Sequence, residues 1–145
     1  MAHRDKAEEE LRKLSMEMRY LEQTAEALQQ RISMVNAALT DINYANLTLD
    51  GIEKEKENTE MLVPIGGSSY VKVKLADSNK VIIGLGAGVS VEKTLPEAKA
   101  TLKERLDELE KTMHAAQQQF SQVADRINSG RSRLENLIAT RDGKQ

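Results

Sequence analysis

The glycine-rich run Gly84-Leu85-Gly86-Ala87-Gly88 has the most obvious chemical potential in this sequence. Such a run can hold a phosphate, but position 89 is Val where a dinucleotide-binding fingerprint has its third glycine. No Lys-Ser or Lys-Thr pair follows, as a P-loop requires. This disfavours nucleotide binding and assigns the glycines to turns, bulges or close strand approach.

The other reactive side chains also lack partners. His3 is terminal, and His114 has no second ligand at helical spacing. Cysteine is absent, which excludes disulfides, thiolate metal sites and a cysteine nucleophile. The carboxylates of Glu53, Glu55 and Glu57 have no expected pocket to work in. We therefore expect no enzyme, no cofactor and no metal site.

The composition and charge of the chain limit the classes of partner that it can bind. Aromatic residues make up 3% of the 145 residues, so a thick core is disfavoured and an elongated single domain is favoured. The net charge of −2 and the scarcity of rings for base stacking argue against a nucleic-acid-binding rod. No apolar run approaches the ~20 residues of a membrane span. The first residues lead into acidic side chains rather than a signal core, so a cytoplasmic protein is expected.

The chain divides into three segments by composition. Residues 1–57 and 94–145 are nearly free of Gly and Pro, whereas residues 58–93 hold most of the glycines, Pro64 and many Val and Ile residues. This division predicts a helix, a pair of β-hairpins and a second helix within one structural domain. The fold class is therefore mainly α with a small β part.

Both predicted helices carry an apolar seam with alternating steps of three and four residues, which is typical of a left-handed coiled coil. An antiparallel pairing places Leu49 beside Leu102 and Leu14 beside Leu137. Asn46 fits a glycosylation pattern, but its seam position favours a register role. The seams comprise Leu11, Leu14, Met18, Leu21, Ala25, Leu28, Ile32, Val35, Leu39, Ile42 and Leu49, and Leu102, Leu106, Leu109, Met113, Ala116, Phe120, Val123, Ile127, Leu134 and Leu137.

Two details of the second helix carry predictions. Thr94 is expected to be its N-cap, with Glu97 completing a capping box and Pro96 tolerated in the first turn. Gly130 lies on the seam opposite Leu21. It either loosens this end of the coil or simply admits Leu21.

The middle segment predicts four short strands in two hairpins, with turns at Gly66-Gly67 and Gly86-Ala87-Gly88. Isolated hairpins are marginal in water, and their edges are unpaired. Because the coil seam is already occupied, we expect the coil to leave the strands uncovered and several chains to pair them into shared sheets. The predicted oligomerisation residues are Val63, Ile65, Val71, Val73, Leu75, Val81, Ile83, Val89 and Val91.

The stretches 62–71 and 81–93, with the helix–hairpins–helix plan, resemble the alpha class of prefoldin subunits of the archaeal type. The resemblance covers nearly the whole chain. It implies a hexamer with two alpha and four beta subunits, whose hairpins form a shared β-barrel platform. It also implies an ATP-independent chaperone that captures unfolded client proteins at the coil tips and delivers them to a group II chaperonin.

The residues at the coil tips that could capture clients are apolar, so they can cover apolar client surface. The methionines among them also adapt to irregular partners. The seam members among them are also explained by packing alone, and the basic C-terminal end by a solvated helix face. The competing function is a structural coiled-coil adaptor that binds one folded partner. The predicted client-binding residues are Leu11, Leu14, Met16, Met18, Leu134, Leu137 and Ile138.

Overall fold

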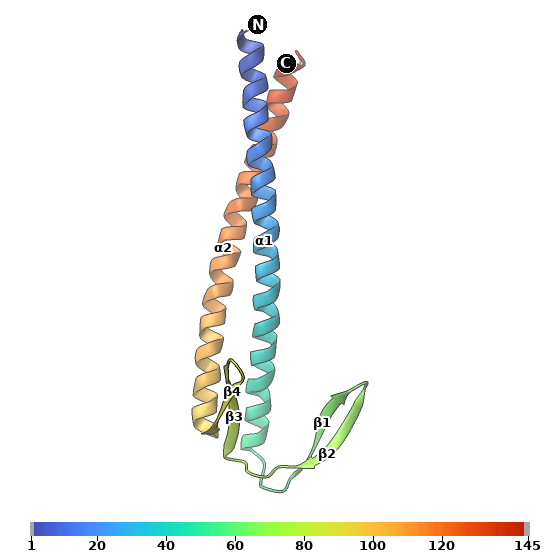
Figure 1. Cartoon of the computed structure of the whole chain (residues 1–145), viewed down its shortest axis with the longest axis vertical. Helices are drawn as coiled ribbons and strands as arrows, with labels where there is room; N and C mark the ends of the chain where they lie inside the picture. The colour runs from blue at the N-terminus through green and yellow to red at the C-terminus, as the bar shows by residue number, and fades with distance from the viewer. Residues whose placement is uncertain (1, 144–145) are drawn as a thin grey trace. The chain divides into compact units, whose positions relative to one another are not determined.

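Helix α1 spans Ala2–Glu53 in the computed structural model, which describes residues 2–143 (Figure 1). No proline interrupts it, and its one glycine, Gly51, lies near its end. Helix α2 spans Leu95–Arg141. The backbone N–H of Glu97 donates a hydrogen bond to Thr94 Oγ1 at 3.3 Å, which confirms Thr94 as the N-cap.

Four strands separate the helices and pair as two antiparallel hairpins (Figure 1). Strand β1 (Glu60–Gly66) pairs with β2 (Ser69–Lys74), and β3 (Lys80–Gly86) pairs with β4 (Val89–Thr94). The first hairpin is extended by backbone hydrogen bonds from Asn58 to Leu75 and from Leu75 to Thr59. The two predicted hairpins are therefore present.

The two hairpins share one turn design. Each register shifts just before its turn, between Pro64 and Gly66 and between Gly84 and Gly86. Gly66 and Gly86 have φ angles of 101° and 97°, which only glycine adopts without a steric penalty. The two residues that follow each of them also have positive φ, as the tight turns of hairpins require.

The residues form two compact units. We call residues 38–110 the hairpin unit and residues 2–37 with 111–143 the terminal unit. In the hairpin unit, both hairpins lie between the end of α1 and the start of α2 in sequence. The hairpin unit has a core that joins α1, β3 and α2, with Ala98 fully buried. The core consists of Leu49, Ile83, Leu95, Ala98 and Leu102, with Ile42, Ala45 and Val81 packed against it.

This core corrects one sequence-based expectation. We expected the helices to leave all the strands uncovered, but Ile83 is 5% exposed among Leu49, Leu95 and Leu102, and Val81 packs beside it. Near the hairpins, the two helices carry apolar residues in addition to those that contact each other along the seam. One face of β3 packs against these residues. The second hairpin is thus partly covered by its own chain.

Polar contacts hold the second hairpin and the two helix ends together. The guanidinium of Arg105 donates to the carbonyl of Gly84 at 2.7 Å, and the N–H of Leu95 donates to the carbonyl of Asn79 at 2.8 Å. Lys99 pairs with Glu53 and, at 2.9 Å, with Asp50.

The same ion pairs determine how Lys99 responds to pH. Hydrogen bonds to Glu53 and then Asp50 raise the pKa of Lys99. A raised folded-state pKa means that this stabilisation is present at neutral pH. It is lost as the pH rises through the alkaline range where Lys99 releases its proton.

The terminal unit has its own core between α1 and α2. It contains Leu14, Met18 and Leu21 from α1, packed against Val123, Ile127, Leu134 and Leu137 from α2. Leu14 and Leu137 share this cluster, as the antiparallel pairing predicts. At Gly130, however, the nearest side chain is that of Met18 rather than Leu21, and a Cβ atom added there would overlap the Met18 sulfur.

Candidate functional site: exposed apolar surfaces and a groove at Gly130

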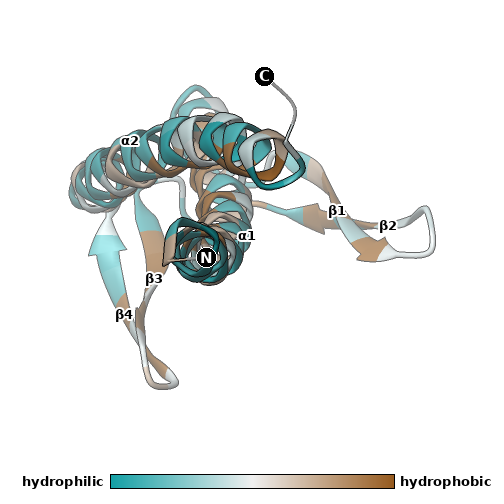
Figure 2. Cartoon of the chain, turned by 90° about the horizontal axis from the view of Figure 1, so that it is seen from above, coloured by the Kyte–Doolittle hydropathy of each residue, from teal (hydrophilic) through white to brown (hydrophobic). Residues whose placement is uncertain are grey.

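The first hairpin exposes apolar side chains on both of its faces. The register pairs Val63 with Val71 and Met61 with Val73 on one face, and Val63 and Val71 remain 40% and 43% exposed. On the other face, Leu62 and Tyr70 are both 61% exposed. In Figures 1 and 2 the β1–β2 hairpin extends away from the helix ends of the hairpin unit. Its apolar surface is therefore available to another chain.

The second hairpin divides its apolar residues between two roles. Ile83 is buried in the core of the hairpin unit, whereas its neighbour Ile82 is 73% exposed. Leu85 and Val89, beside the turn, are 53% and 54% exposed. Ile82 and Leu85 were not among the predicted oligomerisation residues, although alternation along β3 places Ile82 opposite the buried face.

The predicted oligomerisation residues thus fall into three groups. Val63, Ile65, Val71 and Val89 are exposed. Val73, Leu75, Val81 and Val91 are half-buried, and Ile83 is buried. The exposed group is the part of the prediction that this chain leaves free for a partner.

The predicted client-binding residues all lie in the terminal unit, but most of them pack. Leu14 and Met18 are buried, and Leu11, Leu134 and Leu137 are half-buried. Met16 is 67% exposed and Ile138 is 37% exposed. These two side chains lie off the seam, so they are exposed without any opening of the coil.

A second row of uncharged, partly apolar residues on α1 was not predicted from the sequence. It repeats the spacing of the seam two residues further along, and its largest members within the terminal unit are Met16, Tyr20 and Met34. Tyr20 is 67% exposed and Met34 is 75% exposed. The detectable signal is that positions 16, 20, 23, 27, 30, 34 and 37 carry no charge, which is unusual for an outward helix face.

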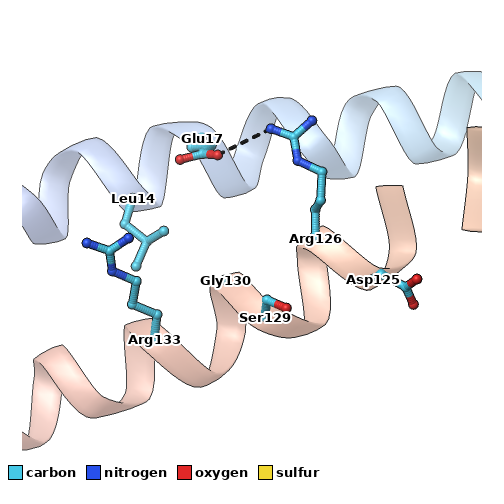
Figure 3. A pocket seen from close by; sticks show the side chains of 7 residues that line it. All are labelled: Leu14, Glu17, Asp125, Arg126, Ser129, Gly130 and Arg133. Atoms are coloured by element: carbon cyan, nitrogen blue, oxygen red, sulfur yellow. Dashed lines mark ion pairs between the residues drawn. The ribbon is translucent and has the colours of Figure 1, made fainter. Parts of the chain in front are cut away.

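A groove of about 310 Å³ opens between α1 and α2 beside Gly130 (Figure 3). The Met18 side chain fills the space directly over Gly130, and the groove opens beside this contact. Arg126 reaches across to Glu17 at 3.6 Å, and Leu14 and Arg133 lie beyond that pair (Figure 3). A smaller cavity of about 150 Å³ shares the lining residues Leu14, Glu17 and Arg133, so the two are adjacent.

The lining of the groove combines one apolar side chain with several charged ones. One apolar side chain, Leu14, lies among the charged rim residues Glu17, Asp125, Arg126 and Arg133. Within residues 2–143, no group of His, Asp and Glu side chains is arranged to hold a metal ion. The groove suits an apolar side chain flanked by polar groups, as in an extended polypeptide.

Gly130 and Met18 provide a test of this packing. By helix propensity alone, Gly130→Ala should raise the free energy of unfolding by about 1 kcal/mol. The new methyl group, however, collides with the Met18 sulfur. We expect no gain in the free energy of unfolding from Gly130→Ala alone. In a Met18→Ala background, the same change should raise it by about 1 kcal/mol. Urea unfolding followed by circular dichroism, at one protein concentration, measures both. An equal gain in both backgrounds would contradict the contact.

The comparisons with known proteins agree with this architecture. The sequence model of the Prefoldin family, described as prefoldin subunit, matches residues 21–139. The chain belongs to the prefoldin family. This family accounts for two long helices joined by small antiparallel strand pairs.

Within the prefoldin family, the chain is similar to alpha subunits. It is 32% identical over 130 residues to prefoldin subunit alpha of Methanococcoides burtonii, covering 90% of this chain and 94% of that protein. It is 34% identical over 119 residues to prefoldin subunit alpha of Pyrococcus horikoshii, covering 81% and 80%. The predicted resemblance to the alpha class is confirmed.

Two solved prefoldin structures share the fold. A cryo-EM structure of filamentous PFD from Methanocaldococcus jannaschii has a TM-score of 0.65 at 23% identity and covers 84% of this chain and 95% of that chain. The crystal structure of the prefoldin beta subunit from Thermococcus strain KS-1 has a TM-score of 0.59 at 17% identity, covering 88% and 90%. Among the described residues, no helix has the length and apolar character needed to cross a membrane.

Proposed function

We propose that this chain is a subunit of an ATP-independent chaperone that holds non-native polypeptides and passes them to a group II chaperonin in the cytoplasm. The observation that carries the proposal is the exposure of apolar side chains, in both hairpins and in the terminal unit, on a chain of the prefoldin family. No catalytic step is required, because holding a client depends only on covering its apolar surface.

The hairpins supply the association surface. Val63, Val71, Ile82 and Val89 are exposed on four different strands. Exposed strand edges and apolar faces pair readily with other chains. We assign these strands to a β-barrel shared with prefoldin beta subunits, in a hexamer of two alpha and four beta subunits.

The terminal unit supplies the client surface. Met16 and Ile138 are exposed there, and the groove at Gly130 offers a shallow apolar floor at Leu14. Burial of client surface contributes about 25 cal/mol for each Å². Several subunits in one assembly then add avidity through effective concentration.

Substitution of the exposed side chains tests this assignment. The double variant Met16→Ser and Ile138→Ser, assembled with its partner subunits, should suppress aggregation of a denatured client several-fold less well, because each serine removes apolar contact area. Light scattering of unrelated denatured clients, without nucleotide, measures the loss. The assembly mass and the helical content should not change.

Met34→Ser is the matched control, because Met34 is exposed on the same helix and lies further along the chain. It should reduce aggregation suppression less than the double variant. An equal loss would assign capture to the outer face of α1 rather than to the residues near the chain ends. If the unmodified assembly suppressed no client at all, the adaptor function would replace the chaperone proposal.

A further inference from the structure

A second groove in the terminal unit has a different chemistry. It measures about 260 Å³ and is lined by Arg31 from α1 and by five residues of α2. The α2 residues are Lys111, Thr112, Ala115, Ala116 and Gln119. No carboxylate lines it, whereas the groove at Gly130 has both signs of charge.

The two cations of this groove have no ion-pair partner within residues 2–143. The ion pairs among the described residues are made by other cations, namely Lys13, Lys99, Arg126 and Arg141. Positions one turn away from Arg31 on α1 hold Ala27, Leu28, Met34 and Val35, none of them charged. Asp107 and Glu108 precede Lys111 by about one turn on α2 but do not line the groove.

The positive charge is therefore local and stands out against a chain with a net charge of −2. A long polyanion such as a nucleic acid would meet acidic side chains on the rest of both helices. A single carboxylate would not. A guanidinium binds a carboxylate through two parallel hydrogen bonds, and an ammonium adds a second point of charge. The buried Ala116 gives the floor an apolar patch that suits the stem of an acidic side chain.

We propose that the groove between Arg31 and Lys111 binds an aspartate or glutamate side chain of a polypeptide segment that crosses the terminal unit. This inference extends the proposed function, because it adds a charge-selective contact to apolar capture. Segments with an acidic residue beside apolar ones then bind better than purely apolar segments.

The probe is a short, amidated peptide that alternates Glu with Ala, together with its Gln counterpart as the uncharged control. Fluorescence anisotropy with the full chain at physiological salt should show preference for the acidic peptide. The Arg31→Gln and Lys111→Gln double variant should bind it about tenfold more weakly, since each exposed ion pair contributes up to about fivefold. Amide NMR shifts should locate the peptide at Ala116 and Gln119.

The matched control is Arg19→Gln with Arg131→Gln, which removes equal charge from exposed positions of the same unit outside this groove. It should change acidic-peptide affinity less than twofold. An equal loss in both double variants would overturn the site in favour of general attraction. Competition by inorganic phosphate at millimolar concentration would also overturn it, in favour of a phosphate site. Peptide binding without aggregation suppression would reject the chaperone function and keep this site.

Discussion

Replacing Val73 with aspartate is expected to dissociate the assembly while leaving most of the helical structure intact. Val73 is half-buried on β2 and pairs with Met61 on the apolar face that also holds Val63 and Val71. A carboxylate on that face would have to be desolvated without a partner when another chain covers it, which costs several kcal/mol. Native mass spectrometry should show the loss of oligomer, and circular dichroism should show retained helix.

The control for Val73→Asp is Lys72→Asp, which places the same carboxylate on the opposite face of the same strand. That face already carries Lys74 and Glu60, so a charge there is compatible with water. Lys72→Asp should retain the oligomer. An unchanged mass for Val73→Asp would contradict the assignment of this face to subunit contact.

The second large effect is expected from Ile83→Ala. Ile83 is 5% exposed and joins β3 to Leu49, Leu95 and Leu102. Truncation of a buried isoleucine leaves a cavity and costs about 2–5 kcal/mol in free energy of unfolding. Urea unfolding at a fixed protein concentration should show this loss in the hairpin unit.

Its neighbour provides the contrast. Ile82 is 73% exposed, so Ile82→Ser should leave the stability of the separated chain within about 0.5 kcal/mol of the unmodified protein. In the assembly, the same change should weaken subunit association. If the two variants destabilised the separated chain equally, the second hairpin would not be held against the helices through Ile83.

Much of the fold follows from local rules that the sequence displays. The lack of proline inside either helix beyond the first turn and the three-and-four spacing predict both helices, and the Thr94 cap marks where α2 begins. The glycine-rich turns predict both hairpins, because positive φ angles are a strictly local requirement. The turns predicted at Gly66-Gly67 and at Gly86-Ala87-Gly88 join the paired strands.

The contacts between distant segments were harder to predict. The packing of Ile83 against Leu95 and the bond from Arg105 to Gly84 depend on how a hairpin folds back onto the helices. Alternation within a strand shows that two faces differ but does not say which face meets the helices. Likewise, the seam spacing aligns Leu21 with Gly130, but the flexible side chain of Met18 takes that space instead.

The turns of the two hairpins also influence the order in which parts of the chain fold. Each hairpin joins strands that are adjacent in sequence, so it can close within about 1–10 μs. The cluster that brings Leu21 and Val123 together joins residues about a hundred positions apart, so it must wait for a costly loop closure. Each hairpin can therefore begin to close before the distant parts of the two helices have met. A newly synthesised chain then spends its earliest lifetime with its association surface exposed, which makes prompt encounter with partner subunits a kinetic requirement.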